Sequence, residues 1–387
     1  MASLTIDPRL YDGVILDLQS DAAVQALAVK LTQAGVATAA RGTNLVAAAA
    51  QLGVAPERSM VLVGPDSGVL GVRAARDGGF AMVIAVNPHG DHEDLHRSGA
   101  SVVVVDLDAI EVRTGDKRMS ECPNALDCDD QVIGVIAERL PMMCLDYDGT
   151  LSDIVADPEA ATLVAGAAQV LRQLATQCPV AILSGRDLAD IHTRVGVPGI
   201  WYAGSHGFEL IGPDGSRHQY DAACAALDVL TDAAAELANQ VGQIPGARVE
   251  HKRFAVAMHY RNVAPDRVAE VVAAAHRQGV RRGLRITSGR KVVELRPDVD
   301  WDKGTALTWI GERMHQAGPV LPVYIGDDLT DEDAFDAVRL TGIGIVVRHS
   351  EDGNRPTAAS FTLNSPAEVG EFLRRVSERL RVAAARG

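Results

Sequence analysis

The sequence has no apolar stretch long enough to span a lipid bilayer and no excess of positive charge. Residues 1–13 include acidic residues and a proline where a signal peptide needs a continuous apolar segment, so we expect a cytoplasmic protein without a membrane partner. The formal net charge is −14, from 37 basic and 51 acidic residues, which argues against a broad surface for nucleic acid or anionic lipid. If the substrate is an anion, a few local groups must therefore hold it.

The sequence is also poor in cysteine, with five residues, an odd number. Cys122 and Cys128 lack the spacing of a zinc finger, and Cys144 lies inside an apolar run typical of a buried strand. We therefore predict reduced thiols without a disulfide framework.

The 387 residues are too many for one ordinary domain and indicate two or three. Short β-branched runs alternate with Ala- and Leu-rich stretches of helical period along the whole chain. One such stretch, residues 164–175, precedes the apolar run 180–183. This alternation is typical of parallel sheets covered by helices, so the predicted fold class is α/β.

Changes in composition along the chain predict its domain boundaries. Residues 1–112 form one predicted domain, and the polar, turn-rich segment 113–140 is a linker with a helix. Residues 141–212 and 294–387 form the predicted core, which carries the intact chemical motifs. Residues 213–293 mix strand-like and helix-like segments, which predicts a smaller inserted α+β lid.

The strongest motif is an apolar run, residues 141–145, that ends in two aspartates one residue apart, Asp146 and Asp148. Because side chains alternate along an extended segment, both carboxylates can point the same way at the carboxyl edge of a sheet, where α/β proteins bind ligands. A turn after a buried strand explains the motif alone equally well.

Groups that suit phosphate chemistry follow at later strand ends. Ser184 and Arg186 come after the run 180–183, where a small hydroxyl and backbone donors at a helix start can hold phosphate oxygens. Lys303 precedes another helix-like stretch, and residues 326–335 place five acidic residues at a strand-to-helix junction. Taken singly, these features are an ordinary turn, a surface lysine and an acidic cluster that either solvent or a cation must neutralise.

Together and in this order, the motifs DYDGT, SGR, DKG and GDDLTDED resemble the haloacid dehalogenase superfamily of phosphohydrolases. The resemblance implies a Rossmannoid parallel sheet with an inserted cap. It also implies that Asp146 is the nucleophile and that Asp148 protonates the leaving sugar oxygen and then activates water. Ser184 and Lys303 would hold the oxygens of the transferring phosphoryl group.

The same resemblance implies a Mg²⁺ ion bound by Asp146, the backbone carbonyl of Asp148 and Asp327, with Asp328 or Asp331 in support. A cation of this kind is also expected from electrostatics, because an anionic carboxylate must attack a phosphate dianion and the two repel each other. Unit charges ~4 Å apart repel by about 1 kcal/mol in water and by more in a protein.

The chain from residue 141 onward resembles trehalose-6-phosphate phosphatases in its strings GSHG, EHK, HYR and ELRP, at residues 204–207, 250–252, 259–261 and 294–297. This resemblance implies that trehalose 6-phosphate is the small-molecule partner. The implied contacts to glucose hydroxyls are Glu250, Lys252 and Glu294, and the implied contacts to phosphate or sugar are Arg186, His206 and Arg261. Without the resemblance, the pattern of residues 249–260 predicts only the polar face of an edge strand.

Residues 1–112 resemble a degenerate copy of the same fold, a second haloacid-dehalogenase-like α/β domain. Asp17 ends a strand-like run as the nucleophile would, but Gln19 stands where the acid should be, and Asp66 echoes the last motif. An amide cannot protonate a leaving group, so we predict that this domain is catalytically silent.

Three other functions remain open on the sequence. The chain could hydrolyse another sugar phosphate, such as sucrose phosphate or mannosyl phosphoglycerate. It could be a non-catalytic sugar-phosphate sensor, or it could transfer the phosphoryl group to a hydroxyl instead of water. The sequence also leaves the oligomeric state open.

Overall fold

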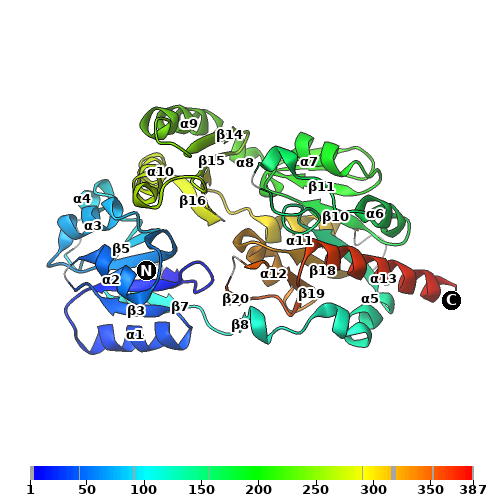
Figure 1. Cartoon of the computed structure of the whole chain (residues 1–387), viewed down its shortest axis with the longest axis horizontal. Coiled ribbons are helices and arrows are strands. Elements are labelled where there is room, and N and C mark those ends of the chain that lie inside the picture. The colour runs from blue at the N-terminus through cyan, green and yellow to red at the C-terminus, as the bar shows by residue number, and fades with distance from the viewer. Residues whose placement is uncertain are drawn as a thin grey trace. The chain divides into compact units, whose positions relative to one another are not determined.

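The protein is described from a computed structural model that covers residues 4–42, 44–89, 92–155, 157–289, 291–314, 320–350 and 353–385 (Figure 1). The chain divides into two compact units, of which one is Met1–Gly115 with Ala225–Asp298 and the other is Asp116–Cys224 with Val299–Gly387. Both are α/β, as predicted. None of the helices in these residue ranges is both long and apolar enough to cross a membrane. All five cysteines are free thiols in this structure.

The second unit is built on an eight-stranded sheet with the order β13-β12-β11-β10-β9-β18-β19-β21. The strands are β9 Leu140–Leu145, β10 Val180–Leu183, β11 Trp201–Gly204, β12 Glu209–Ile211, β13 Arg217–Gln219, β18 Val320–Gly326, β19 Ile343–Val347 and β21 Phe361–Leu363. Strands β10, β9, β18 and β19 are parallel neighbours, so their carboxyl ends meet at one edge. Ligands bind at this edge in open α/β sheets, where the strand order reverses.

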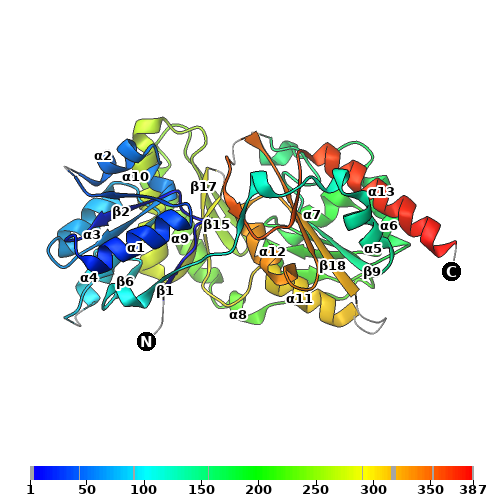
Figure 2. The ribbon, with the colours of Figure 1, turned by 90° about the horizontal axis from the view of Figure 1, so that it is seen from below.

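Helices cover both faces of this sheet, which explains why its central strands are almost wholly apolar. They are α5 Val135–Ala137, α6 Ala167–Ala175, α7 Leu188–Val195, α8 Asp221–Cys224, α11 Lys303–Met314, α12 Glu332–Val338 and α13 Pro366–Ala384. Helices α5, α6 and α13 lie side by side (Figure 1, Figure 2), and they pack on the face that carries Val323 and Ile325. Helix α12 packs on the other face, where Phe335 contacts the ring of Tyr324.

The inserted segment forms an antiparallel sheet of its own, in the order β14-β15-β17-β16. Its elements are α9 Leu227–Val241, β14 Arg248–Lys252, β15 Ala255–His259, α10 Val268–Arg282, β16 Leu284–Gly289 and β17 Val292–Pro297. The compact unit places the ends of this insertion at residues 225 and 298 instead of the predicted 213 and 293. The reason is that β13 extends the large sheet and that β17 pairs along its whole length inside the small one.

The first domain contains a five-stranded parallel sheet in the order β3-β2-β4-β5-β6. Its elements are β1 Leu4–Ile6, β2 Gly13–Asp17, α1 Ala22–Gln33, β3 Ala37–Ala40, α2 Leu45–Leu52, β4 Ser59–Val63, α3 Gly68–Asp77, β5 Met82–Val86, α4 Glu93–Arg97, β6 Val102–Val104 and β7 Ile110–Val112. Strand β1 pairs with β7, so the two ends of the domain close on each other. A short strand, β8 Lys117–Arg118, already belongs to the other unit, where it pairs with β20 Pro356–Thr357.

Helix α10 of the insertion also packs against the first domain. Gly79, at φ +74°, lies so close to Ala269 that a Cβ there would meet its Cα at 2.7 Å. The buried Arg76 contacts Nδ1 of His276 at 3.3 Å. Because α10 also buries Gly279 against the small sheet, it contributes to the packing of both domains.

Candidate active site

A buried lysine joins two of the predicted site residues. Nζ of Lys303, at the start of α11, donates to Oδ1 of Asp146 at 2.7 Å and to Oδ1 of Asp331 at 2.6 Å. Its side chain is only 3% exposed, so it is not a surface lysine. Burial lowers the pKa of Lys303, but the two carboxylates raise this pKa by more than burial lowers it. The net shift is upward, so the ammonium stays charged.

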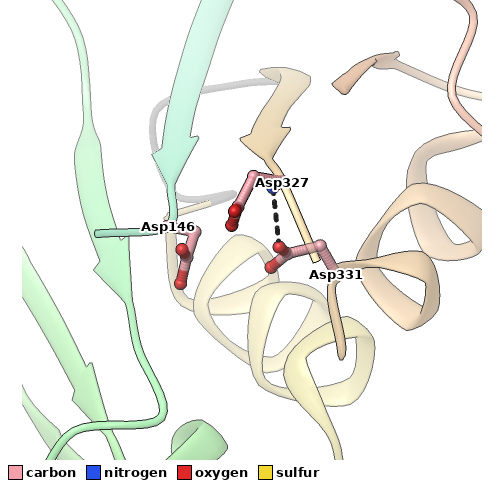
Figure 3. A group of neighbouring side chains, drawn as sticks. All are labelled: Asp146, Asp327 and Asp331. Atoms are coloured by element: carbon pink, nitrogen blue, oxygen red, sulfur yellow. Dashed lines mark hydrogen bonds between the residues drawn. The ribbon is translucent and has the colours of Figure 1, made fainter. Parts of the chain in front are cut away.

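Three aspartates converge beside this lysine (Figure 3). Asp146 follows β9, Asp327 follows β18, and Asp331 immediately precedes α12, and one ligand atom from each lies within 4.8 Å of the others. All three residues are buried. Strand ends far apart in the sequence thus bring Asp146 and Asp327, two of the expected metal ligands, close to Asp331.

Asp331 holds this arrangement in place. Its Oδ2 accepts from the backbone N–H groups of Asp327 at 2.8 Å and Asp328 at 2.9 Å. Its Oδ1 accepts from the hydroxyl of Tyr324 at 2.6 Å as well as from Lys303. With four hydrogen bonds its carboxylate is largely saturated, so Asp331 orients the loop that carries Asp327. The supporting role of Tyr324 was missed, although a tyrosine next to the end of a buried strand needs a partner for its hydroxyl.

The charges of the cluster do not balance. Lys303 and the three aspartates together carry a formal charge of −2 when all four groups are ionised. Burial is the main reason why the pKa of Asp146 is raised to about 8. The charge of Lys303 lowers this pKa, and the charge of Asp331 raises it. A bound divalent cation would favour the ionised form of Asp146. Three buried carboxylates that lie close together form an all-oxygen donor set, which fits a hard divalent ion such as Mg²⁺.

The carboxylate of Asp148 lies outside this cluster. Both of its oxygens accept from Arg186, at 2.7 and 2.8 Å, and the side chain is 47% exposed. Arg186 also donates to Asp190 at 3.0 Å. Such a bidentate, charge-assisted pair fixes both partners. Action as an acid would therefore require Asp148 to exchange this partner for the substrate.

Ser184 and His206 lie together at the ends of β10 and β11. Ser184 is fully buried, and its Oγ accepts from the backbone N–H of Arg186 at 3.1 Å. The backbone N–H of His206 donates to the carbonyl of Ser184 at 2.9 Å, and a Cβ on Gly185 would lie 2.9 Å from the imidazole. Ser205 and His206 have φ values of +50° and +58°. Two successive strained residues at a sheet edge are a common mark of a functional site.

The first motif packs directly on the last. Gly149 has φ +76°, and a Cβ there would lie 2.0 Å from Oδ2 of Asp327. The motif therefore needs glycine both for its conformation and for this close approach. The carbonyl of Gly149 accepts from Nε2 of His349 at 2.8 Å. Sequence reasoning missed His349, whose one signal is its place just after the buried strand β19.

The residues predicted to contact sugar gather on one face of the small sheet. Strand pairing aligns Glu250 with Ala257 and Ala257 with Glu294, and Lys252 donates to Glu294 at 2.8 Å. The opposite face packs on α9 and α10. A hydrogen bond with His259 lowers the pKa of Glu250 although burial raises it. Arg261 lies beyond the end of β15 and is exposed.

Comparisons with known proteins agree with this geometry. Residues 144–367 match the family model described as trehalose-phosphatase. Proteins called trehalose-phosphate phosphatase from Mycobacterium bovis and Mycobacterium tuberculosis are 53% identical over 391 aligned positions, covering 100% of this chain and 99% of theirs. The solved C-terminal domain of trehalose-6-phosphate phosphatase from C. albicans covers 66% of this chain and 98% of its own, at 23% identity and a TM-score of 0.56.

Proposed function

The chain belongs to the trehalose-phosphatase family, and we propose that it releases phosphate from trehalose 6-phosphate through a phosphorylated Asp146. It is a phosphatase, and its catalytic unit has the haloacid-dehalogenase-like fold. The observation that carries the proposal is the buried contact of Asp146 with Lys303 beside Asp327 and Asp331. A sensor that only binds sugar phosphate gains nothing from a nucleophile held in this way.

In the proposed reaction, an oxygen of Asp146 attacks phosphorus while the bond to the sugar oxygen breaks. Asp148 leaves its pair with Arg186, takes up a proton from solvent and gives that proton to the departing sugar oxygen. The now basic Asp148 then takes a proton from water as the water oxygen attacks phosphorus. The bond between phosphorus and Asp146 breaks, which releases phosphate and regenerates the carboxylate of Asp146. Lys303 and Ser184 hold the oxygens of the moving phosphoryl group, because its transfer depends mainly on positioning and electrostatics.

Asp146 and Asp327 would hold Mg²⁺, with Asp331 in support and the carbonyl of Asp148 as a further ligand. When bound, the ion offsets the repulsion between carboxylate and phosphate dianion. We expect exhaustive chelation to abolish phosphate release and added Mg²⁺ to restore it, while the same ionic strength of NaCl should not. Full activity of the metal-free protein in a phosphate-release assay would contradict this part of the proposal.

We assign the glucose hydroxyls to the face of the small sheet that carries Glu250, Lys252 and Glu294, which present acceptors and a donor. Replacing Glu294 by glutamine should raise KM for trehalose 6-phosphate about tenfold or more, since a charge-assisted hydrogen bond is worth roughly 1.5–3 kcal/mol. Hydrolysis of p-nitrophenyl phosphate, which has no sugar, should change little. Glu236→Gln on α9, which packs on the other face of this sheet, is the matched control, and an equal loss with both substrates would argue against sugar recognition.

The first domain is proposed to be catalytically silent. Nη1 of Arg41 lies 3.2 Å from Oδ1 of Asp17 and 3.0 Å from Oγ of Ser67. The amide of Gln19 donates to Asp66 at 2.7 Å. An arginine therefore neutralises the aspartate that matches the nucleophile, and an amide binds the second acid. This arrangement supports a role in packing or regulation instead of chemistry.

A further inference from the structure

His349 connects three neighbouring strand ends of the catalytic sheet. It follows β19, and its Nε2 lies 2.8 Å from the carbonyl oxygen of Gly149, which follows β9. The same nitrogen lies 3.5 Å from Oδ2 of Asp327, which follows β18. The His349 side chain is 16% exposed, so the packing around it restricts its position.

The hydrogen bond to Gly149 determines what His349 can do. A carbonyl oxygen only accepts, so Nε2 must carry the proton and donate. A nitrogen that donates has no lone pair for a cation, which excludes Nε2 as a metal ligand in this arrangement. His349 therefore acts on the peptide of Gly149 and, at longer range, on the carboxylate of Asp327.

Gly149 contacts both His349 and the carboxylate of Asp327. Because a Cβ on Gly149 would lie 2.0 Å from Oδ2 of Asp327, the Gly149 backbone lies directly against that carboxylate. The position of the Gly149 peptide, which the hydrogen bond with His349 fixes, thus limits where the Asp327 oxygens can lie. Partners of this kind tune metal affinity without touching the metal.

We propose that His349 is a positioning residue that fixes Gly149 and Asp327 and so sets the affinity of the aspartate cluster for a divalent cation. The inference rests on the cation site of the proposed function. His349 takes no part in the bond changes, so its loss should be overcome by excess metal.

The test measures Mn²⁺ binding to the full chain by electron paramagnetic resonance, without substrate. The variant His349→Ala should bind Mn²⁺ roughly 10- to 100-fold more weakly than wild type. His349→Gln, whose side-chain amide can still donate to the carbonyl, should recover most of this loss. The half-saturating Mg²⁺ concentration for p-nitrophenyl phosphate should rise in parallel, with kcat at saturating Mg²⁺ nearly restored.

His218→Ala, on the edge strand β13, is the control histidine and should leave Mn²⁺ binding unchanged. Thermal unfolding checks each variant, and if His349→Ala does not fold, His349→Asn takes its place in the same comparison. Equal Mn²⁺ affinity in wild type and His349→Ala, or no difference between the alanine and glutamine variants, would overturn the inference. Absence of Mn²⁺ binding by wild type would overturn the cation site as well, whereas binding without hydrolysis of trehalose 6-phosphate would reject only the proposed substrate.

Discussion

Replacing Asp146 by asparagine is expected to lower kcat by about 10⁴-fold or more, because an amide cannot attack phosphorus. The variant should nevertheless fold. The substitution keeps the shape of the side chain and replaces a buried carboxyl group whose ionisation is already disfavoured, since burial raises the pKa of Asp146 to about 8. Its thermal unfolding temperature without metal should therefore equal or exceed that of wild type. Phosphate release under saturating substrate and thermal unfolding measure the two effects.

Asp17→Asn is the matched control for this prediction. Asp17 ends β2 as Asp146 follows β9, but it pairs with Arg41 in a domain that we propose to be silent. This variant should keep the wild-type kcat. Near-normal turnover by Asp146→Asn would show that Asp146 is not the nucleophile. A large loss of kcat in Asp17→Asn would show that the first domain contributes to the reaction.

Replacing Lys303 by methionine should have the second-largest effect. Methionine is similar in length but has no charge, so Asp146 and Asp331 would lose their shared cation and the phosphoryl oxygens a donor. We expect kcat to fall about 10²- to 10³-fold, the usual effect of removing one such stabilising group. Breaking a buried ion pair also destabilises by roughly 3–5 kcal/mol, so the unfolding free energy measured with denaturant should fall.

Lys291→Met provides the comparison for this second prediction. Lys291 is 53% exposed and lies 3.7 Å from Glu57, so the loss of its charge should change stability by less than about 1 kcal/mol. If Lys303→Met were as stable and as active as Lys291→Met, Lys303 would not be the counter-ion of the cluster.

The parts of the site that follow from parallel-sheet geometry were predictable. Apolar runs identify β9, β10 and β18, and parallel strands place their carboxyl ends together. Asp146 and Asp327 therefore had to lie close, and Lys303 became interpretable once the order of motifs was considered. The same local patterns fix the fold class, because helical and strand periodicities are properties of short segments.

Other features depend on contacts that no local pattern specifies. Alternation along a strand predicts that Asp146 and Asp148 point alike, but β9 ends at Leu145 and the carboxylate of Asp148 pairs with Arg186. The polar segment that forms β13 was assigned to the insertion, because its pairing with β12 is set by the sheet edge and not by its own composition. His349 is in the same class, since its partner lies 200 positions away in the sequence.

The central claim is that this cluster, with Mg²⁺, hydrolyses one particular sugar phosphate. The most direct measurement is kcat/KM of the full chain for trehalose 6-phosphate, sucrose 6-phosphate and mannosyl phosphoglycerate at the same Mg²⁺ concentration, with mass spectrometry of the products. The account predicts a strong preference for trehalose 6-phosphate, with trehalose and inorganic phosphate as products and water as the phosphoryl acceptor. Equal or faster turnover of another substrate, or transfer of the phosphoryl group to a hydroxyl, would contradict it.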